Sequence, residues 1–316
     1  MLKDLVFILI GLLLLTGGGD TLVSGASRLA RRLGVSPLVV GLTIVALGTS
    51  APEMAVSLSA SLTGRGDIAV GNVVGSNISN IGLALGLAAI FRPLVVQIRL
   101  VRFEVPLLFV ITVLTYLIAL TGEMPRWFGT AFLLGLAAYI VMLYRWSLRE
   151  PPEVEAEYAE RETPDGGGLR DAGKVIFGLA ALAGGGNLLV EGAVGVARWA
   201  GLSELVIGLT VVAVGTSLPE MVTAIIAVLK NHSDIAIGNV LGSNIFNTLG
   251  VLGATAAVQP ISVQKALLVR DLPVMGFLTF LLIPFLRSGL VLKRREGVLL
   301  VAIYCFYIVI LLMYHS

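Results

Sequence analysis

The chain contains the same polar, helix-breaking motif twice, each time inside an apolar run. Residues 41–54 read GLTIVALGTSAPEM and residues 208–221 read GLTVVAVGTSLPEM, 167 positions further along. The same shift places DIAVGNVVGSNISN (67–80) on DIAIGNVLGSNIFN (234–247). Because the register holds without a gap across both pairs, the match indicates an internal duplication rather than a shared composition. Any fold for this chain must therefore contain two copies of one unit.

The composition places both copies in a lipid bilayer. Hydrophobic residues make up 57% of the chain and charged residues 13%, whereas a soluble domain carries roughly 25% charged residues. A membrane-crossing helix needs about 20 mainly apolar residues. We predict ten such spans, near 4–26, 37–62, 67–91, 101–121, 126–147, 173–197, 204–229, 234–258, 266–287 and 296–314.

One long hydrophilic stretch separates the two copies. We predict a first five-helix repeat over residues 1–147, a linker over 148–172 and a second five-helix repeat over 173–316. The linker is rich in glutamate, for example Glu153, Glu155 and Glu157. We interpret it as a solvated connection, and a calcium-sensing loop is the alternative.

An odd number of spans per repeat makes the second copy enter the membrane from the opposite face. The predicted fold class is therefore an all-α integral membrane protein with two inverted five-helix repeats, in which broken helices two and seven form the core. Cytoplasmic loops collect Lys and Arg. If the N-terminus is outside, the inner loops hold most of the 22 basic residues, among them Arg28, Arg31 and Arg32. We predict that both termini are extracellular and the linker cytoplasmic, in the cell membrane.

Several classes of function are disfavoured by the residues present. The chain has one cysteine, Cys305, and two histidines, His232 and His315, so no Cys- or His-based metal site is expected. No HExxH motif or Ser/His pair suggests an intramembrane enzyme, and no cofactor is expected. The net charge of +2 offers no argument for nucleic-acid binding.

The repeated motif places a carboxylate, Glu53 or Glu220, at the centre of an apolar run. An unpaired charge there costs at least ~2.5–3.5 kcal/mol. Pro52 and Pro219 lack a backbone donor, so we expect carbonyls over 46–49 and 213–216 to lose helical partners. Carbonyl, hydroxyl and carboxylate oxygens together suit sodium, calcium or magnesium. The alternative is a plain capping box, in which Ser50 and Ser217 cap new helices and the glutamates reach back.

The second motif combines small and polar residues. The glycine pairs, Gly71/Gly75 and Gly238/Gly242, allow close helix approach. Packing alone does not explain the neighbouring polar residues, which are Asn72, Ser76, Asn77 and Asn80 with their mates Asn239, Ser243, Asn244 and Asn247. Positions four apart share a helix face, so we expect the faces with Ser76/Asn80 and Ser243/Asn247 to point at the glutamates.

Two converging carboxylates would supply a charge of −2 at one site. That charge balances one divalent ion or two monovalent ions, and the two sets would exclude each other. Exclusion at one site, combined with alternating access between inverted halves, predicts an antiporter. Protons could replace sodium on the same fold, and a channel lined by these oxygens is a further alternative.

At these residues the chain resembles the cation/calcium exchanger superfamily, and within it the prokaryotic sodium/calcium exchangers. The resemblance rests on G-T-S-x-P-E followed by G-N-x-x-G-S-N, twice at matching spacing. It implies sodium-driven calcium transport. Because both halves of the site lie in one chain, we expect that a monomer would suffice. By position, the resemblance implies calcium ligands at Glu53, Glu220, Thr49 and Thr216. The sodium sites implied are Ala46, Thr49, Ser50 and Ser243 on one side and Ala213, Thr216, Ser217 and Ser76 on the other, with Asn80 and Asn247 in central polar positions.

One of these positions departs from some relatives, which have aspartate where this chain has Asn247. The asparagine argues against potassium co-transport, and we favour sodium over the proton as the driving ion. Outside the motifs, Asp20 with Asn187 and Ser24 with Glu191 are interpreted as polar seams. Arg270–Asp271 and Arg102–Glu104 are interpreted as interfacial pairs.

Overall fold

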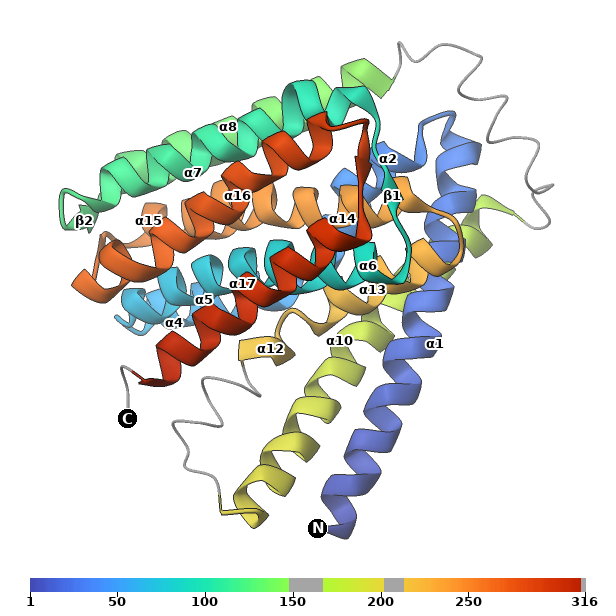
Figure 1. Ribbon diagram of the computed structural model, residues 1–316, viewed down its shortest axis with the longest axis horizontal. Coiled ribbons are helices and arrows are strands. Elements are labelled where there is room, and N and C mark those ends of the chain that lie inside the picture. The colour runs from blue at the N-terminus through green and yellow to red at the C-terminus, as the bar shows by residue number, and fades with distance from the viewer. Residues whose placement is uncertain (148–166, 202–212, 314–316) are drawn as a thin grey trace.

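The computed structural model describes residues 1–147, 167–201 and 213–313. Most of the predicted linker and the start of the seventh predicted span, 204–212, lie outside the described residues, as does residue 314 of the last span. The regular secondary structure of the described chain is helical, apart from two short strand pairs (Figure 1).

The helices follow one another in the order of the predicted spans, and several contain a wider π-helical turn, labelled η. The first repeat contains α1 (Leu2–Leu33), α2 (Pro37–Val40), η1 (Gly41–Val45), α3 (Ala46–Thr49), α4 (Ala51–Leu62), α5 (Gly66–Ser79), η2 (Asn80–Leu85), α6 (Gly86–Phe91), η3 (Leu100–Glu104), α7 (Val105–Ala119) and α8 (Arg126–Ser147). The second contains α10 (Gly168–Trp199), α12 (Ala213–Gly215), α13 (Leu218–Leu229), α14 (Ser233–Phe246), η5 (Asn247–Leu252), α15 (Gly253–Val258), η6 (Leu267–Asp271), α16 (Leu272–Arg287) and α17 (Arg294–Met313).

Eight described helices are long and apolar enough to cross a membrane. The second predicted span is a bent pair, Pro37–Thr49 and Ala51–Leu62, with 46° between its parts. Of the seventh, the described part ends in the shorter apolar helix α13. The helices that contain the first and sixth predicted spans are longer than those spans, because α1 and α10 each extend over 32 residues. Long basic side chains near a helix end, such as Arg31 and Arg32 of α1, can extend to the membrane surface, so a helix can continue beyond its apolar run. Helix α10 begins at Gly168, inside the predicted linker.

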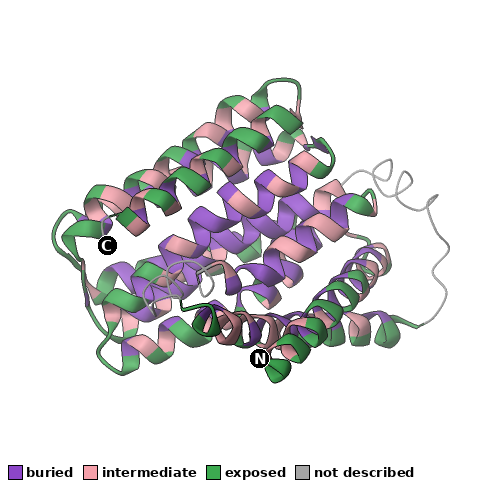
Figure 2. Cartoon of the chain, turned by 60° about the horizontal axis from the view of Figure 1, so that its bottom comes forward, coloured by how far each residue is buried: buried purple, intermediate pink, exposed green. Residues whose placement is uncertain are grey.

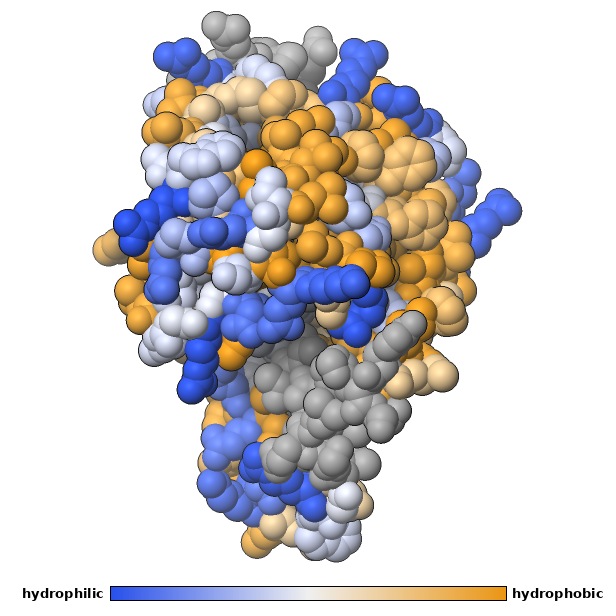
Figure 3. All heavy atoms as spheres, turned by 90° about the vertical axis from the view of Figure 1, so that its left-hand side faces the viewer, coloured by the Kyte–Doolittle hydropathy of each residue, from blue (hydrophilic) through white to orange (hydrophobic). Residues whose placement is uncertain are grey.

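Two helices form the centre of the molecule. The apolar stretch of 66–91 is 78% buried and that of 233–258 is 94% buried, whereas α8 and α17 reach only 28% and 22%. Figure 2 shows the buried residues concentrated along these central helices, with exposed residues on the outer ones. Figure 3 looks onto the end that carries β2, where hydrophilic residues lie next to hydrophobic areas. The polar residues of the second motif therefore lie on the two most buried helices.

Helices α1 and α10 lie side by side as an antiparallel pair (Figure 1). A Cβ placed on Gly11 would lie 2.7 Å from the nitrogen of Leu189 and 2.8 Å from the carbonyl oxygen of Gly185. A Cβ on Gly178 would meet the nitrogen of Leu22 at 2.7 Å and the oxygen of Gly18 at 2.8 Å. Each contact becomes the other when the 167-residue shift is applied, so the two copies meet through reciprocal contacts of opposite direction.

The strand pairs also join the two copies. Strand β1 (Leu94–Val95) pairs antiparallel with β4 (Val291–Leu292), and β2 (Glu123–Met124) pairs antiparallel with β3 (Ile261–Ser262). Beside them, Gln97 Nε2 donates to Asp234 Oδ2 at 3.1 Å and Gln264 Nε2 donates to Asp67 Oδ2 at 2.8 Å. These two bonds are again equivalent under the shift, so each repeat is tied to the other at both ends of the central helices.

Candidate cation site in the membrane core

The helix break at Ser50 differs from its prediction in backbone detail. The carbonyl of Ala46 keeps a helical partner, because Ser50 N–H donates to it at 3.0 Å. In the second copy, Ser217 N–H donates to Val214 O at 3.2 Å. The expectation that the Ala46 carbonyl loses its partner was therefore wrong. The bend instead occurs at Ser50, whose backbone (φ −85°, ψ 5°) leaves the helical region before α4 begins at Ala51, with Pro52 in its first turn.

The capping-box alternative is not what the structure contains. Neither Ser50 nor Ser217 makes a side-chain cap to its own helix. Ser50 Oγ donates to Glu220 Oε1 at 3.1 Å, across the boundary between the repeats. The hydroxyl of one motif therefore serves the carboxylate of the other.

The two predicted glutamates converge in a fully buried place. Both Glu53 and Glu220 are 0% exposed, and Ser50, three positions before Glu53, donates its hydroxyl to Glu220 Oε1. Thr49 and Ser243 lie beside Glu220, and Ser76 lies beside Glu53. Bringing two carboxylates together without water is unfavourable unless a cation or a proton joins them.

Several buried oxygens of the two broken helices and the two central helices have no hydrogen-bond partner within the described chain. They include both carboxylate oxygens of Glu53, Oε2 of Glu220, the hydroxyls of Ser76 and Ser217, Oδ1 of Asn80 and the side-chain amide of Asn247. A buried polar atom without a partner costs about 1–3 kcal/mol. Such a concentration of unsatisfied hard oxygens is the chemistry that binds sodium or calcium.

The central helix α14 closes onto the broken helix of the first repeat. A Cβ on Gly242 would lie 2.7 Å from both Ala46 Cβ and Leu42 O, so only glycine allows this approach. As a result Ser243 Oγ lies 3.5 Å from Ala46 O and 3.4 Å from Thr49 Oγ1. Three positions implied as sodium ligands are thus brought together. Thr216 is half-buried in the second break, and the side chain of Ala213 lies outside the description.

A network of asparagines links the central helices and was not foreseen in this form. Asn80 Nδ2 donates to Asn244 Oδ1 at 3.0 Å, and Asn244 Nδ2 donates to Asn77 O at 3.2 Å. Asn77 Nδ2 donates to Thr248 Oγ1 at 2.9 Å. The second motif predicted the polar positions of its own residues. Thr248 lies outside that motif, so its part in the network was not predicted.

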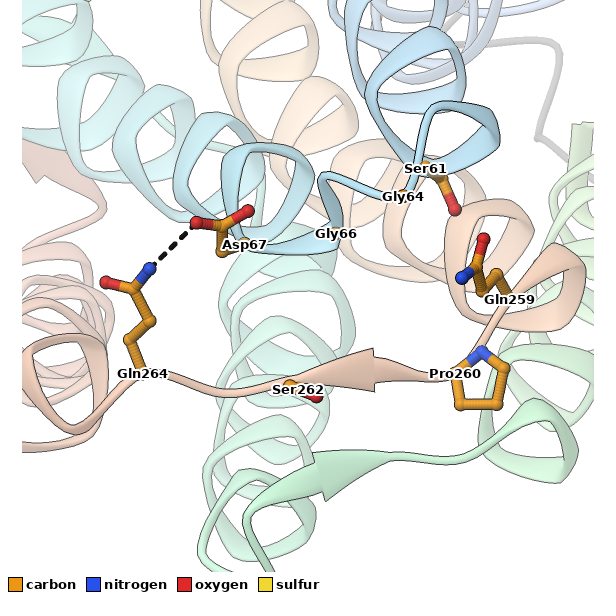
Figure 4. Close-up of a pocket in the computed structure, with 8 residues that line it drawn as sticks. All are labelled: Ser61, Gly64, Gly66, Asp67, Gln259, Pro260, Ser262 and Gln264. Carbon is orange, nitrogen blue, oxygen red and sulfur yellow. Dashed lines mark hydrogen bonds between the residues drawn. The ribbon is translucent and has the colours of Figure 1, made fainter.

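A cleft of about 260 Å³ reaches the two helix breaks. Its lining comes from α4, α10 and the start of the second broken helix, namely Pro52, Val56, Ala183, Gly186, Asn187, Val190, Glu191, Gly215, Thr216 and Pro219. A separate polar pocket of about 310 Å³ lies between the α4–α5 turn and β3, next to the Asp67–Gln264 bond (Figure 4). Ser61 of that pocket is about 12 Å along α4 from Glu53, so this pocket is distinct from the carboxylate site.

Of the two charge pairs predicted outside the motifs, the structure contains one and corrects the other. Arg270 pairs with Asp271 at 2.6 Å. Glu104 pairs with Arg99 at 3.2 Å, whereas Arg102 was the predicted partner. Asp20 and Ser24 both contact Lys230 of the α13 end, at 2.6 and 2.7 Å. The equivalent residues of the second repeat, Asn187 and Glu191, line the cleft.

Comparison with known proteins agrees with this architecture. The family model described as sodium/calcium exchanger protein matches residues 3–145 and 172–313. The chain is 42% identical to the putative antiporter CaxA of Alkalimonas amylolytica over 95% of this chain and 96% of the relative. It is 33% identical to the sodium/calcium exchanger MaX1 of Methanosarcina acetivorans, with 98% of each covered. The solved sodium/calcium exchanger from Methanococcus jannaschii superimposes with a TM-score of 0.83 at 31% identity over 98% of both chains. The chain, a multi-span membrane protein with one buried carboxylate in each copy of its repeated motif, therefore belongs to the sodium/calcium exchanger family.

Proposed function

We propose that this antiporter exchanges sodium for calcium across the cell membrane by alternating access. The observation that carries the proposal is the burial of Glu53 and Glu220, with Ser50 of the first motif donating to Glu220 of the second and with both carboxylate oxygens of Glu53 left without a hydrogen-bond partner in the described chain. Two carboxylates match the charge of one divalent ion. Sodium would be bound by the neighbouring oxygens once calcium has left.

In this proposal calcium is bound by Glu53, Glu220 and the carbonyls of Thr49 and Thr216. Sodium is bound through Ala46, Thr49, Ser50 and Ser243 in one set and Ala213, Thr216, Ser217 and Ser76 in the other. Asn80 and Asn247 stay neutral at the centre. Supporting this, Ala46, Thr49 and Ser243 lie together, and both asparagines have unpartnered oxygens within the described residues.

The proposed topology has ten spans in two inverted repeats, with both termini outside and residues 148–172 inside the cell. The reciprocal antiparallel contacts of α1 with α10 support the inversion. The two matching Gln–Asp bonds support it independently. Because both halves of the site belong to one chain, a monomer would suffice.

The proton is the competing driving ion, because relatives of this chain include a putative antiporter whose ion is not stated. The test loads vesicles that contain the purified protein with sodium and dilutes them into sodium-free buffer with radioactive calcium. Calcium uptake that requires the outward sodium gradient supports the proposal. Uptake driven by a pH gradient without sodium contradicts it in favour of proton exchange, and gradient-independent leak indicates a channel.

A further inference from the structure

Asn239, the first asparagine of the second G-N-x-x-G-S-N motif, is buried but is not one of the proposed calcium or sodium ligands. Asn239 is 0% exposed and lies on α14, one turn before Ser243. Its Nδ2 donates to the backbone carbonyl of Glu220 at 3.2 Å. Its Oδ1 accepts from Thr49 Oγ1 at 3.1 Å. One amide therefore connects the carboxylate residue of the second repeat with the helix break of the first.

The equivalent asparagine of the first repeat makes a different second bond. Asn72 Nδ2 donates to the carbonyl of Glu53 at 3.3 Å, which mirrors Asn239 and Glu220. It also donates to Ser57 Oγ at 2.9 Å, within its own repeat. The duplication thus preserved the contact to each glutamate, whereas the contact across the repeats is made by Asn239.

We propose that Asn239 is a positioning residue that sets Thr49 of one repeat against Glu220 of the other, and this inference rests on the proposed calcium site. Thr49 contributes a carbonyl to that site, and its hydroxyl lies between Asn239 Oδ1 and Ser243 Oγ. An amide that holds both partners fixes the distance between a carbonyl ligand and a carboxylate ligand. Calcium, which needs several oxygens at 2.3–2.6 Å, is sensitive to that distance.

The test measures equilibrium binding of radioactive calcium to the purified, sodium-free protein for a double-mutant cycle. Asn239→Ala and Thr49→Val, which keeps the Thr49 carbonyl, should each weaken calcium binding about tenfold. Combined, they should weaken it little more than either alone, because both remove the same bond. The matched cycle of Asn72→Ala with Thr216→Val should be additive.

The melting temperatures of the calcium-free variants distinguish a residue that positions calcium ligands from one that only stabilises the packing. A lower melting temperature with unchanged calcium affinity in Asn239→Ala, or additive effects in the first cycle, overturns the inference. Asn239→Leu keeps the branched shape of the side chain, leaves no cavity, and covers the case in which the alanine variant does not fold. If neither variant folds, Thr49→Val alone must weaken calcium binding more than Thr216→Val does. A wild-type protein that binds no calcium would instead overturn the proposed calcium site, and this inference with it.

Discussion

Two buried carboxylates of this membrane protein have opposite surroundings. Glu220 accepts a hydrogen bond from Ser50 and has no cationic partner among the described residues, whereas Glu104 lies 3.2 Å from Arg99, which in turn lies over the ring of Trp146 at 4.7 Å. Glu220→Gln should weaken calcium binding by at least about a hundredfold, because one unit-charge pair at 4 Å is worth about 4 kcal/mol at an effective dielectric constant near 20. Equilibrium binding of radioactive calcium to the purified protein measures this.

Glu104→Gln is the matched control, since it also removes a fully buried carboxylate charge. It should retain calcium binding and lower the melting temperature, because Arg99 loses its ion-pair partner in a poorly hydrated place. A Glu104→Gln protein that loses calcium binding, beside a Glu220→Gln protein that keeps it, would refute the assignment of the site.

At the level of single residues, part of the candidate site could be predicted from the sequence. Glu53, Glu220 and the prolines before them stand out because each violates the apolar pattern around it. The choice of partners was not readable. Ser50 reaches the other repeat instead of its own helix, and Glu104 pairs with Arg99 because the π-helical turn η3 brings positions five apart together. Partner choice depends on tertiary packing, which a one-dimensional pattern does not contain.

Close approach between elements depends on a few glycines, and Gly242 provides the sharpest test. A Cβ added to Gly242 would lie only 2.7 Å from Ala46 Cβ and from Leu42 O. Gly242→Val should therefore push α14 from the break, cost about 1–3 kcal/mol of stability and reduce sodium-driven uptake severalfold. Gly17→Val on α1 is the control, because no described atom lies within 4 Å of its added Cβ. Equal transport by both variants would contradict the role of this contact.

Element lengths illustrate the limit of prediction at the same scale. The central spans, 67–91 and 234–258, were predicted to within a residue, because Asp67 and Asp234 begin them and Pro93 and Pro260 follow them. For α1 and α10 the apolar run ends before the helix does, so hydropathy underestimates their length. The apolar run of a sequence shows how much of a helix can contact lipid. It does not show where the backbone hydrogen bonds of that helix end.

The whole molecule is less symmetric than its sequence. A Cβ on Gly19 of α1 would lie 2.6 Å from Ile226 Cδ1 and 3.2 Å from Val222 Cγ1 of α13, so this contact is closed. For the mate, Gly186 of α10, the nearest atoms belong to Pro219 at 3.8 Å, and the cleft separates α10 from α4. The closed side is pinned by Lys230, which pairs with Asp20 at 2.6 Å and donates to Ser24 at 2.7 Å. Its counterpart under the shift is Thr63, which bonds to its own helix at 3.0 Å.

On the proposed alternating-access mechanism, this asymmetry makes the two access states unequal, and Lys230→Met should reduce the difference. An exposed ion pair contributes up to about 1 kcal/mol, so the variant should populate the state opened between α1 and α13 about fivefold more. A cysteine at position 222, in a Cys305→Ala background, reports that opening through its rate of modification by a thiol reagent. The rate should rise about fivefold in Lys230→Met and stay unchanged in Lys3→Met, which breaks the exposed Lys3–Glu191 pair at the opposite end of α1. An unchanged rate in Lys230→Met would mean that α1 is held on α13 by apolar packing alone, through Val222 and Ile226.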